Sequence, residues 1–293
     1  MTEFSDKRVV VSGASRGIGL AISKRLASGG ASIAILAKTA EPHAKLPGTI
    51  YTAAEEIEEA GGRALPIVTD IRSEEQVKSA VAQTVDAFGG IDICINNASA
   101  ISLTSTANTP MKRFDLMFDV NVRGTFLLAK ECIPHLARGE NPHILNISPP
   151  LDVKAKWFAP HVAYTMSKFG MSLCVLGMSE ELKKQGIAVN ALWPHTVIAT
   201  AAIANVVGGE VALGHCRKAD IMGDAAAAIV SKDARTFSGN FCIDDLLLAA
   251  EGIKDFSSYR VDPEKELWSD FFVPADTPEV EALVMPMNLH GAA

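Results

Sequence analysis

Two residues in the second half of the chain have a spacing that suits proton transfer. Tyr164 stands four residues before Lys168, so on a helix both side chains project from the same face. A positive charge beside a phenol favours the phenolate and lowers the phenol pKa. A tyrosine activated in this way can exchange a proton with a substrate oxygen near neutral pH. The pair indicates a general acid/base, although the same spacing also fits a surface tyrosine beside a solvated lysine.

A glycine-rich segment near the amino terminus suits the binding of phosphates. The run Ser12-Gly13-Ala14-Ser15-Arg16-Gly17-Ile18-Gly19 follows a β-branched stretch and precedes a helical pattern. Glycines in such a turn let backbone amides approach a pyrophosphate, which the positive end of the following helix also favours. The spacing is G-x-x-x-G-x-G, and a purely structural turn is the alternative. We expect a dinucleotide site here.

The end of the second predicted strand indicates which dinucleotide is preferred. Sites for NAD usually place an acidic residue about 20 residues after the glycines, where it binds the ribose 2′-hydroxyl. Here the strand ends Leu36-Ala37-Lys38-Thr39, and no acid follows until Glu41. Lys38 and Arg16 could instead meet a 2′-phosphate. We therefore expect NADP(H), with NAD as the less favoured cofactor.

The elements that must position these groups alternate along the chain. The predicted strands are 8–11, 32–36, 64–68, 91–95, 143–147, 187–192 and 240–243, several of them apolar almost throughout. Helical repeats begin near Ile18 and recur near 74–88, 111–138, 162–184 and 219–231. This order predicts the α/β class, as a single doubly wound (Rossmann) domain with a seven-stranded parallel sheet.

The predicted domain spans residues 1–250, because no linker rich in Ser, Pro or Gly divides it. It would hold both the dinucleotide and the catalytic residues. Residues 251–293 differ in composition, with the prolines and aromatics Pro263, Trp268, Phe271, Phe272, Pro274, Pro278 and Pro286. We expect this C-terminal tail to pack on its own domain or on a neighbouring subunit, with a short disordered tail as the alternative.

Composition excludes several classes of function. The 293 residues carry a net charge of −7 without a basic block, which argues against a nucleic-acid partner. The odd number of widely spaced cysteines argues against structural disulfides and against a metal site; they are Cys94, Cys132, Cys174, Cys216 and Cys242. We find neither a signal-peptide core nor an apolar run long enough for a membrane span, and the last residues are not a peroxisomal signal. A cytoplasmic location is expected.

Several motifs, in this order, resemble the short-chain dehydrogenase/reductase family. They are Ser12–Gly19, Asn96-Asn97-Ala98, Asn121, Tyr164 with Lys168, and Val189–Pro194, within residues 6–245. The long link at residues 37–51 and the run Asn146-Ile147-Ser148-Pro149-Pro150 resemble one subgroup, the hydroxysteroid dehydrogenase-like protein 2 proteins. Animal members of that subgroup carry a further sterol-carrier-like domain, which we expect this chain to lack.

The resemblance implies a role for each matching residue. Tyr164 would be the general acid/base, Lys168 would bind the nicotinamide ribose, and Asn121 would support a proton-relay water, unless it only stabilises a helix kink. Asp70 would meet the adenine, with a helix cap as the alternative. The other cofactor contacts implied by the resemblance are Gly13, Ser15, Arg16, Gly17, Ile18, Gly19, Asn97 and Ala98.

Three positions depart from the family pattern. Ser99 replaces a glycine, which a small residue still fits. Pro194-His195 replaces the usual Pro-Gly, and we expect His195 to be a solvent-facing loop residue rather than a substrate contact. The family's carbonyl-polarising serine falls at Pro149, so Ser148, one position earlier, is the candidate substitute. Loss of such a donor commonly costs about 10²–10³ in rate.

The motifs together predict an NADP(H)-dependent oxidoreductase that interconverts an alcohol and a ketone. Residues 157–160, Trp193 and residues 197–203 would line a pocket for an apolar, lipid-like small molecule, or would belong to the core. A nucleotide-binding regulatory or scaffolding protein is the alternative that the Pro149 departure suggests, and reduction of a carbon–carbon double bond is a third. Family members usually pair through helices at the positions of 111–138 and 162–184, which implies a homodimer or homotetramer.

Overall fold

The computed structural model describes residues 3–43, 46–204 and 209–284. Seven parallel strands form one sheet, as the sequence predicts, and their order is β3-β2-β1-β4-β5-β6-β7. They are β1 (Arg8–Ser12), β2 (Ser32–Ala37), β3 (Arg63–Val68), β4 (Ile93–Asn96), β5 (His143–Ile147), β6 (Ala188–Trp193) and β7 (Phe241–Ile243). The central strands are buried on both faces, which explains their continuous apolar runs.

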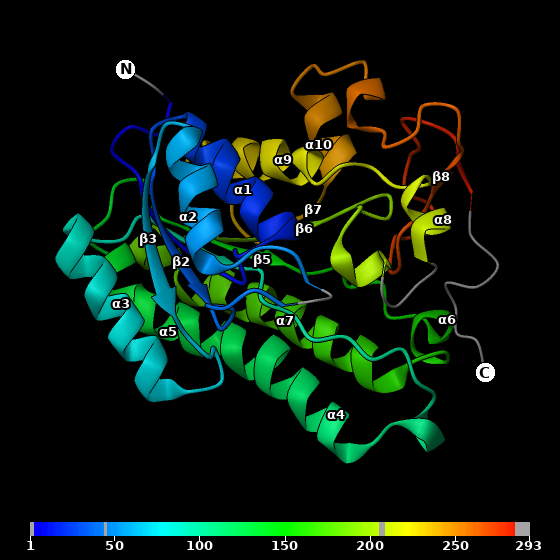
Figure 1. The fold of residues 1–293 in the computed structure, drawn as a ribbon, viewed down its shortest axis with the longest axis horizontal. Helices are drawn as coiled ribbons and strands as arrows, with labels where there is room; N and C mark the ends of the chain where they lie inside the picture. Colours follow the sequence, from blue (N-terminus) through cyan, green and yellow to red (C-terminus); the bar gives the residue numbers. More distant parts are fainter. Residues whose placement is uncertain (1–2, 44–45, 205–208, 285–293) are drawn as a thin grey trace.

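Helices cover both faces of the sheet (Figure 1). One face carries α1 (Gly17–Ser28), α2 (Ile50–Glu59), α9 (Asp220–Val230) and α10 (Asp244–Ala250). The other carries α3 (Glu74–Phe88), α5 (Gly124–Leu136) and α7 (Val162–Glu181). Two apolar clusters, one under each helical layer, make up most of the core. The strand order reverses between β1 and β4, so their carboxyl ends open a crevice where α/β proteins bind ligands.

Two helical segments differ from the sequence prediction. The expected helix at 111–138 is divided into α4 (Met111–Met117), a π-helical turn (Phe118–Arg123) and α5. Helix α2 was not predicted, although Ile50, Ala53 and Ile57 supply its buried face. Thr49 caps α2 by accepting hydrogen bonds from the backbone amides of Tyr51 and Thr52. The link from β2 is therefore partly helical.

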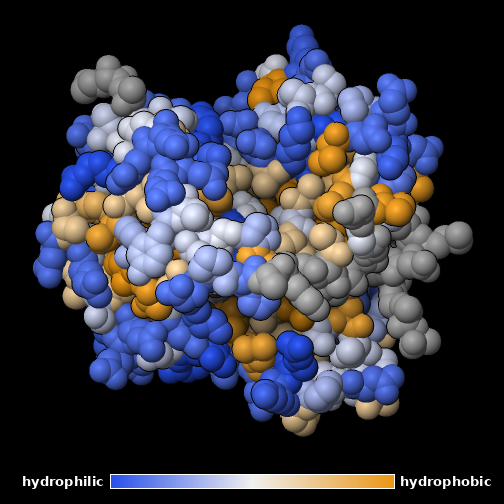
Figure 2. Space-filling model, in the orientation of Figure 1, coloured by the Kyte–Doolittle hydropathy of each residue, from blue (hydrophilic) through white to orange (hydrophobic). Residues whose placement is uncertain are grey.

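The described part of the C-terminal segment packs against its own chain. Strands β8 (Leu267–Trp268) and β9 (Leu283–Val284) belong to this segment, and α6 (Ala155–Phe158) and α8 (Gly209–Leu213) lie near it. Strands β8 and β9 pair in parallel, and Val197 and Trp268 are joined through a backbone hydrogen bond of 2.9 Å. On the face drawn in Figure 2, apolar groups reach the surface on the side of α8. The domain boundary at residue 250 stays a prediction.

Within residues 3–43, 46–204 and 209–284, no helix has both the length and the apolar character that a bilayer crossing requires.

Candidate active site

The glycine turn packs closely against the loop that follows β4. Gly13 and Gly17 have φ angles of 70° and 58°, in the region that favours glycine. A Cβ on Gly13 would lie 2.8 Å from the Cα of Ala98, and one on Gly19 would collide with the Asn97 amide. The glycines thus allow the loop after β4 to touch the loop after β1.

Asn97 holds these two loops together. Its side-chain amide donates hydrogen bonds to the carbonyl oxygens of Ser12 and Gly13, at 3.1 and 3.0 Å. The Ser12 hydroxyl accepts from the backbone amides of Asn97 and Ala98, both at 3.1 Å. Asn97 and Ala98 therefore lie beside the glycine turn, and their contact with a cofactor stays a prediction.

The amino terminus of α1 is suited to an anion. Arg16 occupies the N-cap position, but its side chain makes no hydrogen bond to the first backbone amides of the helix. Its guanidinium instead donates to the carbonyl oxygens of Pro47 and Gly48, at 2.8 and 2.9 Å. Ser15 is buried, and Ile18 packs on the core. These contacts fit a phosphate-binding turn, with Arg16 also pinning the link that follows β2.

Lys38 and Asp70 meet at the other end of the crevice. The Lys38 ammonium, 59% exposed, lies 4.0 Å from the Asp70 carboxylate. Arg72 binds that carboxylate through its guanidinium at 2.6–3.1 Å and through its backbone amide at 3.1 Å. These hydrogen bonds hold the pKa of Asp70 below its usual value. Ser73, not Asp70, caps α3, so the helix-cap alternative for Asp70 is wrong.

Tyr164 and Lys168 lie on one face of α7, as their spacing predicts, and both are buried. The Lys168 ammonium donates a hydrogen bond of 2.7 Å to the carbonyl oxygen of Ile147 and lies 3.4 Å from the Met171 sulfur. It also stands 5.0 Å from the centre of the Trp193 ring. The pair is thus placed at the carboxyl end of β5, with its ammonium bound to that strand.

Burial controls the protonation of this pair. It raises the pKa of Tyr164 above its usual value, and the Asp270 carboxylate adds to the rise. Burial lowers the pKa of Lys168 to about 7. The lowered tyrosine pKa expected from the sequence is therefore not found. The physical reason is that Tyr164 is only 6% exposed, so loss of water disfavours the phenolate.

Asn121 sits in the π-helical turn between α4 and α5. Its side chain accepts from the Ala100 backbone amide at 2.7 Å and donates to the Ala100 carbonyl at 3.0 Å and the Ser167 hydroxyl at 2.9 Å. Ser167 in turn donates to the Tyr164 carbonyl at 2.8 Å. Asn121 thus joins the loop after β4 to α7, and π-helical turns of this kind are frequent at functional sites.

Ser148 occupies the first position after β5. It is fully buried, and within the described ranges no protein group makes a hydrogen bond to its hydroxyl. The Pro149 carbonyl accepts a 2.6 Å hydrogen bond from Ser172 of α7, which fixes the following loop. A buried hydroxyl without a partner is unfavourable, and it has a donor to offer a substrate oxygen. Ser148 is therefore available for the role that the sequence assigns to it.

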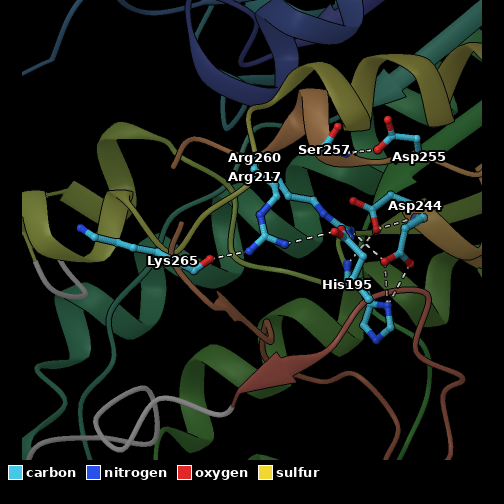
Figure 3. Close-up of polar contacts among 9 residues, drawn as sticks. His195, Arg217, Asp244, Asp255, Ser257, Arg260 and Lys265 are labelled. Atoms are coloured by element: carbon cyan, nitrogen blue, oxygen red, sulfur yellow. Dashed lines mark hydrogen bonds and ion pairs between the residues drawn. The ribbon is translucent and has the colours of Figure 1, made fainter. Parts of the chain in front are cut away.

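His195 is not the solvent-facing residue that the sequence suggested. It is 2% exposed, and its Nδ1 lies 2.9 Å from the Asp245 carboxylate. Arg217, also buried, donates to the same carboxylate at 2.7 Å and to Glu281 of the C-terminal segment (Figure 3). The expectation failed because Asp245, whose carboxylate binds the buried imidazole, lies 50 residues away in the sequence.

The C-terminal segment reaches the tyrosine. Phe272 is fully buried, and its ring centre lies 6.1 Å from that of Tyr164 and 5.8 Å from that of Trp193. The Asp270 amide donates to the His195 carbonyl at 3.0 Å. The aromatics expected to line a pocket form one packed cluster with Phe271 and Phe272.

Sequence reasoning missed two further residues near these sites. A Cβ on Gly17 would lie 3.5 Å from the Thr200 methyl, so Thr200 faces the glycine turn. Asp270 influences the pKa of both Tyr164 and Lys168. Thr200 lies in the loop after β6. The loops that follow parallel strands meet at one edge of the sheet, so its place near the glycine turn could have been predicted. Nothing local in the sequence connects Asp270 to α7.

Comparison with known proteins agrees with this architecture. A sequence profile described as short chain dehydrogenase matches residues 7–209. Hydroxysteroid dehydrogenase-like protein 2 from Danio rerio is 56% identical over 97% of this chain and 67% of its own length. The Homo sapiens protein of that name is 56% identical over 90% of this chain and 63% of its own. The chain thus spans about two thirds of the length of these relatives.

Solved structures agree as well. A provisionally assigned dehydrogenase from Xanthomonas campestris is 52% identical, with a TM-score of 0.90 over 94% of this chain and all of its own. A short chain dehydrogenase from Mycobacterium thermoresistibile is 49% identical, with a TM-score of 0.88 over 99% of this chain and all of its own. The family match covers more than half of the sequence and confirms the resemblance seen in the motifs. The chain belongs to the short-chain dehydrogenase/reductase family of NAD(P)-dependent oxidoreductases.

Proposed function

We propose that this protein interconverts an alcohol and a ketone on an apolar, lipid-like small molecule, with NADP(H) as cofactor and Tyr164 as general acid/base. One observation carries the proposal. Tyr164 and Lys168 share a face of α7 at the sheet edge where the glycine turn and Asn97 meet. An acid/base pair beside a dinucleotide turn suits carbonyl reduction, because the proton and the hydride would reach the same substrate.

The residues divide the proton chemistry among them. During reduction the Tyr164 hydroxyl donates its proton to the substrate oxygen, and during oxidation the phenolate accepts it. Lys168 stabilises the phenolate and binds the nicotinamide ribose, while Asn121 supports proton relay. Ser148 donates a hydrogen bond to the substrate oxygen where negative charge develops. A bound nicotinamide dinucleotide would supply or accept the hydride.

The charges near β2 support the choice of NADP(H). Lys38, with its exposed ammonium, begins the link from β2 to α2, and the Arg16 guanidinium binds the other end of that link. Arg16 has five N–H donors, so its bonds to Pro47 and Gly48 leave others for a 2′-phosphate. A short chain dehydrogenase from Burkholderia cenocepacia, 29% identical with a TM-score of 0.69, was solved in complex with NADP. More distant structures, 23% and 21% identical, were solved with NAD.

The aromatic surroundings of Tyr164 support an apolar substrate. Trp157 and Trp193 are buried beside it, and Phe158 and Ile203 pack on the same cluster while partly exposed. Such a wall favours hydrocarbon over polar groups because it removes apolar surface from water.

A second candidate function has a specific observation in its favour. Tyr164 is 6% exposed, its pKa is raised, and the Lys168 ammonium is bound to Ile147. These features are compatible with a nucleotide-binding regulatory or scaffolding protein, which does not need Tyr164 to exchange a proton. Turnover separates the two candidates, because only the enzyme requires the phenol to exchange a proton.

The test is NADPH oxidation with a panel of apolar ketones, comparing Tyr164→Phe with the wild type. We expect the substitution to lower kcat by about 10²–10⁴ while NADPH affinity stays unchanged. Tyr259→Phe is the matched control, because the Tyr259 hydroxyl donates to Asp224 of α9 and not to a residue of the proposed site. Equal turnover by Tyr164→Phe and wild type would show that another group handles the proton. Tight NADPH binding without turnover of any ketone would favour the regulatory protein.

We also propose a homodimer or homotetramer in the cytoplasm. The outer face of α7 carries Met166, Leu173 and Leu176, exposed by 42%, 57% and 55%, and Phe126 of α5 is 53% exposed. Apolar side chains gathered on paired helices favour association with a second copy.

A further inference from the structure

Phe272 fills the space beside the proposed proton donor. Its ring lies among those of Trp157, Phe169 and Trp193, with ring centres 5.5–5.9 Å away, and of Tyr164 at 6.1 Å. None of its surface is exposed. It comes from the C-terminal segment, which approaches on the side of α8 (Figure 1). Phe272 thus completes the aromatic surroundings of Tyr164, although it lies more than 100 residues further along the chain.

Several hydrogen bonds hold Phe272 in position. The Trp193 indole donates a 2.7 Å hydrogen bond to the Phe271 carbonyl, directly before Phe272. The Asp270 amide donates to the His195 carbonyl at 3.0 Å, and an isolated β-bridge joins Thr196 to Ser269. These contacts all reach the end of β6 and the residues after it. The segment is therefore attached to the part of the sheet that borders the active site.

A second set of contacts, between charged groups, holds the segment further along. Buried Arg217 joins Asp245 of α10 to Glu281, and Arg260 donates to Glu281 at 3.1 Å. Figure 3 shows this arrangement, with Arg217 and Arg260 close together and His195 beyond the carboxylates. Phe272 lies between these two sets of contacts, which together fix its position beside Tyr164.

The backbone at Phe272 gives an independent indication of function. Its φ of 66° lies in the left-handed region, which a bulky residue other than glycine rarely adopts. Such conformations persist only where the surroundings determine them, and they concentrate at active sites and ligand-binding sites. A glycine at this position would relieve the strain but would leave the space beside Tyr164 open.

We propose that Phe272 is a specificity-determining residue: its ring closes the substrate pocket and limits the size of the apolar group next to the carbonyl. This inference rests on the proposed function, because it concerns the substrate of the Tyr164 site. It predicts a preference for ketones with small or flat substituents near the carbonyl. Shortening the Phe272 side chain should shift that preference toward bulkier ketones.

The experiment compares wild type, Phe272→Leu and Phe272→Ala on cyclohexanone, 2-decalone and a four-ring ketosteroid. We expect kcat/KM for the largest ketone, relative to the smallest, to rise about 10-fold or more in Phe272→Ala and less in Phe272→Leu, since pocket volume commonly has effects of this size. Phe4→Ala is the matched control, because Phe4 is equally buried but packs on Gly29 and Arg25. An unchanged ratio in both Phe272 variants, when both remain folded by thermal denaturation, overturns the proposal.

A binding measurement separates this inference from the proposed reaction. Trp157 and Trp193 border the Phe272 ring, so their fluorescence should report binding of the same ketones to the NADPH-saturated protein. If the size preference in Kd shifts in Phe272→Ala while no variant turns over any ketone, Phe272 limits ligand size and the proposed reaction is wrong. If the preference in Kd does not shift, or if no ketone binds to any variant, Phe272 does not have this role.

Discussion

The ammonium of Lys168 donates a 2.7 Å hydrogen bond to the carbonyl oxygen of Ile147, the last residue of β5. The next residue, Ser148, carries a buried hydroxyl that binds no group in the described part of the chain. The cation of the proposed acid/base pair and the candidate carbonyl donor thus both lie at the end of β5. An ammonium has three hydrogens, so the bond to Ile147 leaves Lys168 able to bind a ribose as well.

Replacing Ser148 with alanine should lower kcat by about 10²–10³, because the substrate oxygen would lose a donor where charge develops. The Kd for NADPH should stay the same, since Ser148 is proposed to contact substrate only. Steady-state kinetics and a fluorescence titration with NADPH measure the two quantities. Ser23→Ala is the control, because the Ser23 hydroxyl is also buried but donates to Gly19 on α1. A wild-type kcat in Ser148→Ala would mean that the carbonyl is polarised by another group.

Replacing Lys38 with alanine should weaken NADPH binding about 10-fold and leave NADH binding unchanged. The reason is that a 2′-phosphate, which only NADPH carries, would lose one ion pair of roughly 1–2 kcal/mol at a partly exposed site. Isothermal titration with each dinucleotide measures the effect. Lys24→Ala is the control, because Lys24 is an exposed lysine of α1 paired with Glu56. If Lys38→Ala weakened both dinucleotides equally, Lys38 would not recognise the 2′-phosphate.

The sequence was sufficient for those features that depend on neighbours in the chain. Runs such as Val9–Val11 indicate buried strands, and the positive φ angles of Gly13 and Gly17 are a local property of the glycine turn. Helix α2 could also have been found, because Thr49 is a capping residue before the apolar spacing of Ile50, Ala53 and Ile57.

The features that were missed depend on distant partners. His195 is buried because Asp245, 50 residues later, supplies its partner. The pKa of Tyr164 is raised because Phe272 and its neighbours exclude water, which no local pattern indicates. The π-helical turn at Asn121 likewise depends on hydrogen bonds to Ala100 and Ser167, from two other parts of the fold.

Replacing Arg217 with methionine should destabilise the protein by about 3–5 kcal/mol. Arg217 is fully buried, and its loss would leave the Asp245 carboxylate buried without a cationic partner on that side. Urea unfolding measures the free energy. Arg25→Met is the control, because Arg25 is one-third exposed in its ion pairs with Glu3 and Asp224 and should cost no more than about 1 kcal/mol. Similar losses in the two variants would show that the buried network contributes nothing special to stability.

Replacing Leu173 with glutamate should convert the proposed oligomer to monomers. A charge in the middle of the exposed apolar face of α7 would be desolvated at an interface with a second copy. Light scattering after size-exclusion chromatography measures the molar mass. Val153→Glu is the control, since Val153 is 73% exposed in the loop after β5. If the wild type is a monomer, or if Leu173→Glu keeps the wild-type mass, this face is not the interface.

The stability of the protein should fall as the pH rises from about 4 to 7, through a contribution from Asp270. Burial raises the pKa of Asp270 to about 7, so in this range the folded state keeps a proton that the unfolded state has lost. The folded state then binds more protons, and the free energy of unfolding decreases as pH rises. Asp244 has its pKa raised to about 7 by burial and by Asp245, and adds to the same trend.

Asp270→Asn isolates the contribution of one carboxyl. The variant cannot titrate at this position, so its stability relative to wild type should increase between pH 4.5 and 7.5, by on the order of 1–2 kcal/mol for a partly buried group. Urea unfolding of both proteins at the two pH values gives the difference. Above pH 7, Lys168 should instead raise the free energy of unfolding as the pH rises. Its pKa in the folded state is lowered to about 7, so the unfolded chain keeps a proton that the folded state has lost. A difference between wild type and Asp270→Asn that is the same at pH 4.5 and 7.5 would show that Asp270 is ionised throughout this range.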